Sequence, residues 1–219
     1  MARWHGDQIW HAGTVTRSKP HTYAVQSQTE HFAGPVFSVV TDEVTMPGGE
    51  VVKRDYLRHV GAVAVVALDE RERVVLVHQY RHPVRRPLWE LPAGLVDVPG
   101  ERLPEVAARE LAEEADLVAA RWDVLVDLHT SPGVSDEAIR VFLARDLSPS
   151  PHPHPREHEE AGLTVARVPL DEAVAKVLSG QITNGPAVAG LLAAARARDL
   201  GWAPLRALDA PPPPPIAGP

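Results

Sequence analysis

The chain of 219 residues contains no cysteine, and aromatic side chains make up only 5% of it. Without cysteine it can form neither a disulfide nor a thiolate nucleophile, which fits a reducing compartment. Nowhere do about 18 apolar residues follow one another, the length that a membrane-spanning helix needs. The first residues also lack an apolar run of signal-peptide length. We therefore expect a cytoplasmic protein that does not bind a membrane.

Basic runs are missing as well. The 22 lysines and arginines are outnumbered by 29 acidic residues, and the net charge is -7. Proteins that bind nucleic acid usually carry a basic patch that faces the phosphates, so we expect no nucleic-acid partner. Hydrophobic residues make up 44% of the chain, enough to bury one sizeable core. The composition predicts one domain with extensions.

Carboxylates gather in one stretch of the chain, residues 91–117. Good helix formers and a proline in the first turn predict a helix over residues 104–115. At 3.6 residues per turn, Glu110 and Glu114 share a face, with Glu113 beside them. Like charges at this spacing repel by roughly 0.2–0.5 kcal/mol per pair. Two interpretations follow: a solvated face on which Arg109 pairs with Glu113, or a site for divalent metal ions.

The spacing of these residues resembles the Nudix box, which reads glycine, five residues, glutamate, seven residues and R-E-U-x-E-E-x-G-U, with U aliphatic. Here Gly94 and Glu101 precede the run RELAEE, which begins at Arg109. Six residues instead of five separate Gly94 from Glu101, which predicts a one-residue bulge before the helix. Asp116 replaces the final glycine, a position that needs the left-handed conformation. Because Asp tolerates it at a cost of about 1 kcal/mol, we expect reduced stability and not loss of activity.

The resemblance covers roughly residues 36–195 and implies an α/β fold, the Nudix α/β/α sandwich with a mixed β-sheet, plus an N-terminal β-sheet extension. We divide the chain into an N-terminal arm and β-hairpin (1–58), a Nudix hydrolase domain (59–202) and a disordered proline-rich tail (203–219). Residues 1–30 are expected to be irregular, and the hairpin strands to span residues 36–46 and 51–60. Related nucleotide-sugar pyrophosphatases often dimerise through such a sheet, so we expect a homodimer.

Patterning predicts the other elements. The apolar run 61–68 is typical of a strand buried on both faces. Asp171 is expected to cap one helix, which ends near Ser179, and Asn184 to cap another with an apolar stripe. Further strands are predicted at residues 74–80, 122–129, 139–144 and 164–168.

The resemblance also implies a metal site for Mg2+ or Mn2+. Its ligands would be the carboxylates of Glu110, Glu113 and Glu114, with the backbone carbonyl of Ala93. Oxygen ligands are those that magnesium prefers. Arg109 would orient the carboxylates through charge-assisted hydrogen bonds. Arg109 and Glu113 are therefore counted with the catalytic residues.

A glutamate in a later loop acts as general base or metal ligand in the relatives. The matching position is Glu160, and Glu159 is its close rival. A charged, solvated loop is the alternative for both residues, which follow the proline-rich segment 148–155.

Substrate-binding residues are also suggested by matching positions. Arg81 would hold a diphosphate with its guanidinium fork, and Glu90 would assist. Arg85 and Arg86 are expected on a solvated loop. Arg54 matches a substrate-binding arginine of relatives, but an ordinary exposed strand residue is the equal alternative.

The loop 130–138, TSPGVSDEA, identifies a subgroup. Pro132 lies sixteen residues after Asp116, and a proline at that distance marks the ADP-ribose pyrophosphatase group. SPG-x-S-D-E resembles that group's loop, so we include Ser135 and Asp136 among the substrate-binding residues. The implied reaction is metal-dependent hydrolysis of ADP-ribose to AMP and ribose 5-phosphate. Two alternatives stay open: hydrolysis of another nucleoside diphosphate sugar or nucleotide, and a non-catalytic ADP-ribose-binding module, which could dispense with the three carboxylates.

Overall fold

Strand β4 (Ala62–Ala67) is the centre of the fold, and all six of its residues are buried. The computed structural model describes residues 22–151 and 163–212. Strand β4 pairs in parallel with β9 (Ala138–Pro149) and antiparallel with the short β7 (Ala93–Leu95). Strand β8 (Leu117–His129) pairs with the other side of β9, which gives the order β7-β4-β9-β8. The expected mixed sheet is confirmed.

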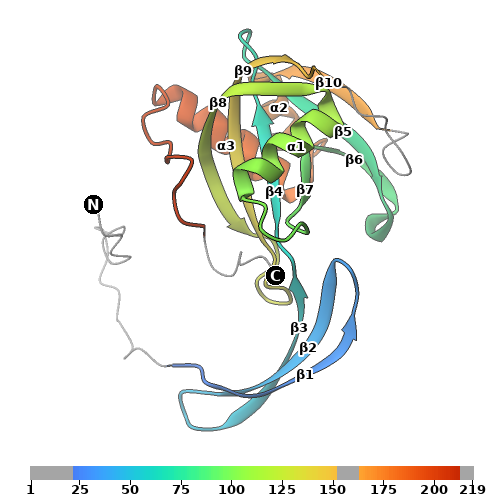
Figure 1. Cartoon of the computed structure of the whole chain (residues 1–219), viewed down its shortest axis with the longest axis vertical. Helices are drawn as coiled ribbons and strands as arrows, with labels where there is room; N and C mark the ends of the chain where they lie inside the picture. The colour runs from blue at the N-terminus through green and yellow to red at the C-terminus, as the bar shows by residue number, and fades with distance from the viewer. Residues whose placement is uncertain (1–21, 152–162, 213–219) are drawn as a thin grey trace.

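Alternate side chains of β4 belong to two different cores, because successive residues of a strand point to opposite faces. Val66 shares one core with Leu191 of α3 (Gly185–Asp199) and with Leu170 of α2 (Leu170–Leu178). Val65 shares the other core with Leu111 of α1 (Leu103–Ala115). Helix α1 therefore covers one face of the sheet, and α2 and α3 cover the other (Figure 1). This arrangement confirms the α/β/α sandwich.

A second, antiparallel sheet has the order β10-β5-β6. It contains β5 (Arg73–Arg81), β6 (Arg86–Glu90) and β10 (Thr164–Pro169), and the short 3-10 helix η1 (His82–Val84) joins the first two. The expectation of a loop at Arg86 is wrong, because this residue opens β6 and pairs with Arg81. The sequence RPLWE gave no alternating pattern from which a strand could be predicted.

The N-terminal extension is a three-stranded sheet that projects from the sandwich (Figure 1). Its order is β1-β2-β3, with β1 (Val25–Ala33), β2 (Phe37–Thr45) and β3 (Val51–His59). The two predicted strands are present, but the expected irregular structure is wrong for residues 25–30, because β1 begins at Val25. Residues 1–21 lie outside the described part. Because polar side chains lie all along β1, its sequence shows no alternation of apolar and polar residues that would predict a strand. Pairing with β2 forms it instead, aided by the Gln28 side chain, which donates to Asp42 at 2.8 Å.

Residues 203–212, which we call the C-terminal strap, lie against β8. The amide of Val124 donates to the carbonyl of Arg206 at 3.0 Å, and the reverse bond measures 3.2 Å. The expectation of disorder from residue 203 is therefore wrong for this part of the tail. Because these contacts reach across more than 80 positions of the chain, local composition did not reveal them. Residues 213–219 lie outside the described part.

Helix ends follow the predicted chemistry in part. Asn184 caps α3, and its side-chain oxygen accepts a hydrogen bond from the amide of Ala187 at 3.0 Å. Asp171 does not cap α2, because the helix begins at Leu170 and Asp171 lies in its first turn. There its negative charge still interacts favourably with the positive, N-terminal end of the helix dipole. In the described residues no helix is long and apolar enough to cross a membrane.

The two departures from the Nudix box have local solutions. The extra residue is taken up by a turn in which the amide of Glu101 donates to the carbonyl of Val98 at 3.1 Å. Pro99 and Gly100 occupy its centre, and Gly100 has φ +81°, as a type II turn requires. At the other end of α1, Asp116 has φ 53° and ψ 38°, the expected left-handed conformation.

Replacing Asp116 by glycine is expected to raise the free energy of unfolding by about 1 kcal/mol, because glycine reaches the left-handed region without a Cβ clash. Urea unfolding of the two proteins measures the difference. Asp116→Ala is the matched variant and should lower stability, since alanine lacks the local polar contacts that ease this conformation. A less stable glycine variant would show that contacts of the Asp116 side chain outweigh the backbone strain.

Candidate active site

Helix α1 places the glutamates of the box at the edge of the core. Glu110 and Glu114 are one turn apart, and only 8% and 4% of their surfaces are exposed. Val106 and Leu111 of the same helix are fully buried and fix its position on the sheet. Buried carboxylates are costly unless they are paired or hydrogen-bonded. The free-energy cost of burying these two carboxylates therefore depends on their hydrogen-bond partners.

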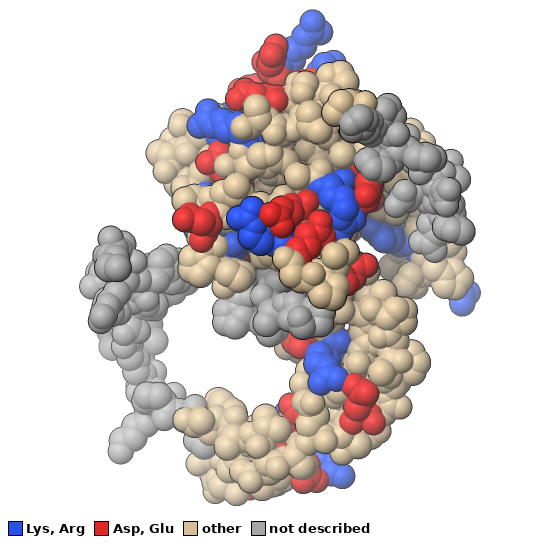
Figure 2. Space-filling view, viewed as in Figure 1, with Lys and Arg blue, Asp and Glu red and all other residues tan. Residues whose placement is uncertain are grey.

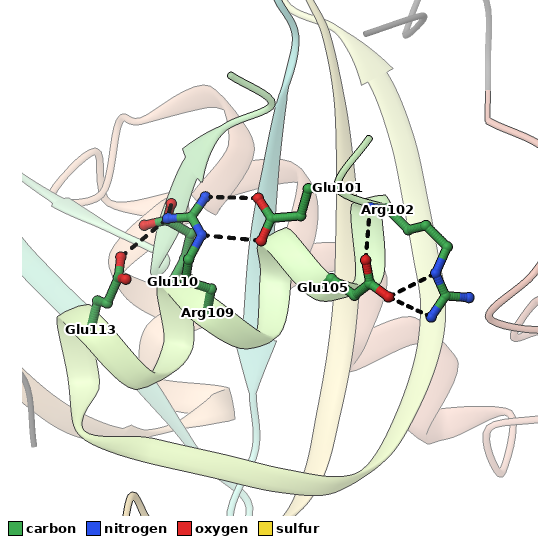
Figure 3. A network of polar contacts seen from close by, with 6 residues as sticks. All are labelled: Glu101, Arg102, Glu105, Arg109, Glu110 and Glu113. Atoms are coloured by element: carbon green, nitrogen blue, oxygen red, sulfur yellow. Dashed lines mark hydrogen bonds and ion pairs between the residues drawn. The ribbon is translucent and has the colours of Figure 1, made fainter. Parts of the chain in front are cut away.

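Arg109 holds three of the carboxylates together (Figure 3). Its Nε and Nη2 donate to the two oxygens of Glu101, both at 3.2 Å. Its Nη1 donates to Glu110 at 2.6 Å and to Glu113 at 3.1 Å. Burial disfavours the charge on Arg109, but the Glu101 hydrogen bond and the nearby carboxylates outweigh it and raise the arginine's pKa. Arg109 therefore stays cationic at any physiological pH.

Strand β7 brings the backbone against this helix. Glu114 accepts a hydrogen bond from the amide of Ala93 at 2.9 Å. At Gly94, an added Cβ would lie 2.0 Å from both Cδ and Oε1 of Glu110. Only glycine permits this approach, because no other residue leaves room for the carboxylate. The fold thus brings strand β7 against Glu110 and Glu114, and the role of these residues and of the Ala93 carbonyl as metal ligands stays a prediction.

The carboxylates on and before α1 are oxygen donors of the kind that a divalent cation prefers. Glu101, Glu110 and Glu113 accept hydrogen bonds from Arg109, and Glu114 accepts one from the amide of Ala93, so four carboxylates against one guanidinium leave three negative charges in excess when all are ionised. Acidic and basic side chains lie next to one another on the face that α1 presents (Figure 2). Among the described residues no three acidic or histidine side chains converge closely enough to hold an ion. Glu110 and Glu113 are turned toward Arg109 instead, so their assignment as metal ligands stays a prediction.

Arg81 and Glu90 form a bidentate pair across β5 and β6. Nε of Arg81 donates to Oε1 of Glu90 at 3.0 Å, and Nη2 donates to Oε2 at 2.7 Å. Glu90 is 2% exposed, whereas 41% of the Arg81 side chain remains exposed. The structure therefore shows Glu90 holding Arg81 at the end of β5. Substrate binding by either residue stays a prediction.

The loop between β8 and β9 is fixed against β3. The Asp136 carboxylate accepts a hydrogen bond from the amide of His59 at 2.8 Å. The Ser135 hydroxyl accepts one from the amide of Glu137 at 3.0 Å. Leu57 exchanges backbone bonds with this loop, donating to Val134 and accepting from Asp136. These contacts shape the loop, and a role of Ser135 and Asp136 in substrate binding stays a prediction.

Arg54 is the described candidate that lies away from the box. Arg54 lies midway along β3, in the sheet that extends away from α1 (Figure 1), and it donates to the carbonyl of Lys53 at 3.0 Å. Glu160 and its rival Glu159 lie outside the described residues. The role of Glu101 is not evident from the sequence alone. Its spacing of eight residues before Arg109 was visible, but only the folded turn shows that the two side chains meet.

The fold and this site define a class of protein: an α/β/α sandwich in which a glutamate-bearing helix packs beside a glycine-containing strand. The chain belongs to the NUDIX domain family, which it matches over residues 57–189.

Named relatives cover most of its length. It is 49% identical to the ADP-ribose pyrophosphatase of Mycobacterium tuberculosis over 84% of this chain and 88% of that one. It is 34% identical to the ADP-ribose pyrophosphatase of Bacillus subtilis, over 69% and 80% of the two chains. A crystal structure of an ADP compounds hydrolase has the same fold, with a TM-score of 0.69 and 21% identity, covering 84% of this chain and 99% of that one.

Gly94→Ala should displace the Glu110 carboxylate, because the new Cβ would occupy its place. We expect Mn2+ affinity to fall about 10- to 100-fold, the range seen when groups that orient metal ligands are disturbed. Titration with Mn2+ followed by electron paramagnetic resonance measures this directly. Gly48→Ala is the control, since a Cβ there meets nothing within 4 Å. Unchanged affinity in Gly94→Ala would remove Glu110 from the metal site.

Proposed function

We propose that this protein is a metal-dependent Nudix hydrolase that cleaves the diphosphate of ADP-ribose to AMP and ribose 5-phosphate. The observation that carries the proposal is the acidic face of α1, on which Arg109 binds Glu110 and Glu113 and Glu114 accepts a hydrogen bond from the amide of Ala93. The substrate is supported by relatives named ADP-ribose pyrophosphatase, one of which is 49% identical over most of the chain.

The charge of the substrate explains why an acidic site suits the reaction. When bound, Mg2+ or Mn2+ would neutralise diphosphate oxygens and lower the pKa of a coordinated water. Glu110, Glu113, Glu114 and the carbonyl of Ala93 would hold the ions. The excess of carboxylates over arginine makes this side of the protein attractive to cations and repulsive to the free diphosphate.

Arg109 acts by positioning. It holds Glu110 and Glu113 through one nitrogen and is itself held by both oxygens of Glu101. The bidentate pair with Glu101 restricts the rotation of Arg109, so its Nη1 keeps a defined position from which it binds Glu110 and Glu113. In this role Arg109 would act on the carboxylates and not on the reacting phosphorus.

Arg81 would bind the diphosphate. Its side chain is partly exposed, while the buried Glu90 fixes its orientation. Ser135 and Asp136 would bind the substrate from the loop between β8 and β9. Glu160, or Glu159, would remove the proton from the attacking water, and the bridging oxygen would leave with the departing phosphate.

We also propose a homodimer formed through the N-terminal sheet. All nine residues of β1 are exposed, and Phe32, Phe37 and Leu57 expose 52%, 39% and 37% of their surfaces. Contiguous exposed apolar residues often mark a protein–protein interface. A partner chain on this sheet would give Arg54 access to the partner's substrate. Absence of cysteine supports a cytoplasmic location.

Release of AMP from ADP-ribose with Mg2+ tests the reaction. Glu114→Gln should lower kcat/KM by at least about 100-fold, because a ligand charge is lost while side-chain size is kept. Glu105→Gln is the matched control, since this exposed glutamate of the same helix contacts Arg102. Chelation by EDTA should abolish the release, and added Mg2+ should restore it.

Parallel assays with ADP-glucose, NADH and diadenosine polyphosphates separate the alternatives. Turnover of one of these without turnover of ADP-ribose would retain the hydrolase and reject the substrate. Binding of ADP-ribose without turnover of any compound would indicate a binding module.

Phe32→Asp should convert the dimer to a monomer, because it buries a charge in the proposed interface. Size-exclusion chromatography with light scattering measures the mass of each species. Leu192→Asp on α3 is the control, since this residue is 40% exposed on a different surface. A wild-type protein that is already monomeric at micromolar concentration would refute the interface.

A further inference from the structure

The C-terminal strap ends on a buried arginine. Arg140 of β9 is 2% exposed, and its Nε and Nη2 donate to the two oxygens of Asp127 at 2.8 Å and 3.1 Å. Its Nη1 donates to the carbonyl of Ala210 at 2.6 Å, and Nη2 donates to that of Pro211 at 2.7 Å. A buried guanidinium must satisfy its donors. The strap carbonyls therefore accept hydrogen bonds from guanidinium donors of Arg140 that the core alone would leave without partners.

The strap makes a second contact with the same carboxylate. Nη1 of Arg206 donates to Oδ2 of Asp127 at 2.6 Å, and 35% of the Arg206 side chain is exposed. Burial acts to raise the pKa of Asp127, but the hydrogen bonds from Arg140 and Arg206 outweigh it and the pKa is lowered. Asp127 is therefore ionised and links the strap to the sheet. We call its pair with Arg140 the junction.

This junction lies at the base of the loop between β8 and β9. Asp127 and Arg140 stand directly opposite each other in the ladder, and His129 and Ala138 form the last pair before the loop. The tip of the loop is held from the other side, because Leu57 of β3 exchanges backbone bonds with Val134 and Asp136. The loop is therefore held by two sets of contacts: those of Leu57 at its tip and those of the junction at its base.

We propose that Arg206 is a positioning residue for the substrate. Through the junction of Asp127 and Arg140 it fixes the base of the loop, so that Ser135 and Asp136 keep the orientation that binds the nucleotide sugar. Arg206 itself contacts Asp127 and β8 and acts through them. This inference rests on the proposed function of the loop.

The test uses full-length Arg206→Ala, Arg206→Lys and Arg198→Ala. Arg206→Ala should raise KM for ADP-ribose about fivefold with kcat changed less than about twofold, because binding is weakened and not the chemistry. Lysine should restore most of the loss, since a single nitrogen makes the Asp127 contact. Arg198→Ala is the control: it removes an arginine that pairs with Asp171 and Glu72, which lie outside the junction and the loop.

Hydrogen exchange gives a readout that is independent of turnover. Peptides that cover residues 130–137 should exchange about tenfold faster in Arg206→Ala than in the wild type, and no faster in Arg198→Ala. Unchanged exchange in the loop, or an equal rise of KM in Arg198→Ala, would overturn the inference. If the wild type fails to hydrolyse ADP-ribose, the proposed function fails, while faster loop exchange in Arg206→Ala would still establish the coupling of strap and loop.

Discussion

One guanidinium makes the acidic helix possible. Glu110, Glu113 and Glu114 lie within two turns of α1, where their mutual repulsion would disfavour the helix and the burial of two of them. Arg109 offsets this repulsion with hydrogen bonds to Glu110 and Glu113 and is itself held by Glu101, while the amide of Ala93 donates to Glu114. The same contacts fix the directions of the glutamates, so stability of the helix and organisation of the site have a common cause.

The site also depends on how closely two backbones approach. Strand β7 passes so near to α1 that the Glu110 carboxylate takes the space of a Cβ at Gly94, while the amide of Ala93 reaches Glu114. The hydrophobic core maintains this distance, because Val65 of β4 and Leu111 of α1 are both fully buried in the core between the sheet and the helix. Core packing thus determines how closely the Glu110 and Glu114 carboxylates approach strand β7.

The parts outside the sandwich converge on one loop. Strand β3 of the N-terminal sheet contacts the tip of loop 130–137, and the C-terminal strap contacts the strands at its base. Both extensions therefore connect physically to the segment with the SPG motif. Ion pairs at such joints are worth more when burial excludes water, as it does around Arg140.

The sequence by itself determined the elements whose patterns are local. The apolar run of β4, the glutamate spacing of α1 and the Asn184 cap of α3 all depend on neighbouring residues, so periodicity and capping chemistry were enough to place them. The box resemblance also located Gly94 and the turn conformation of Asp116. Only the folded structure decided β1, β6 and the strap, because these polar or proline-containing segments carry no local pattern. The two strands gain their hydrogen bonds by pairing with the neighbouring strands β2 and β5, whereas the partners of the strap on β8 and β9 lie far along the chain. The contact between Arg140 and Ala210 spans 70 positions, and no local pattern specifies which distant carbonyl will satisfy a buried arginine.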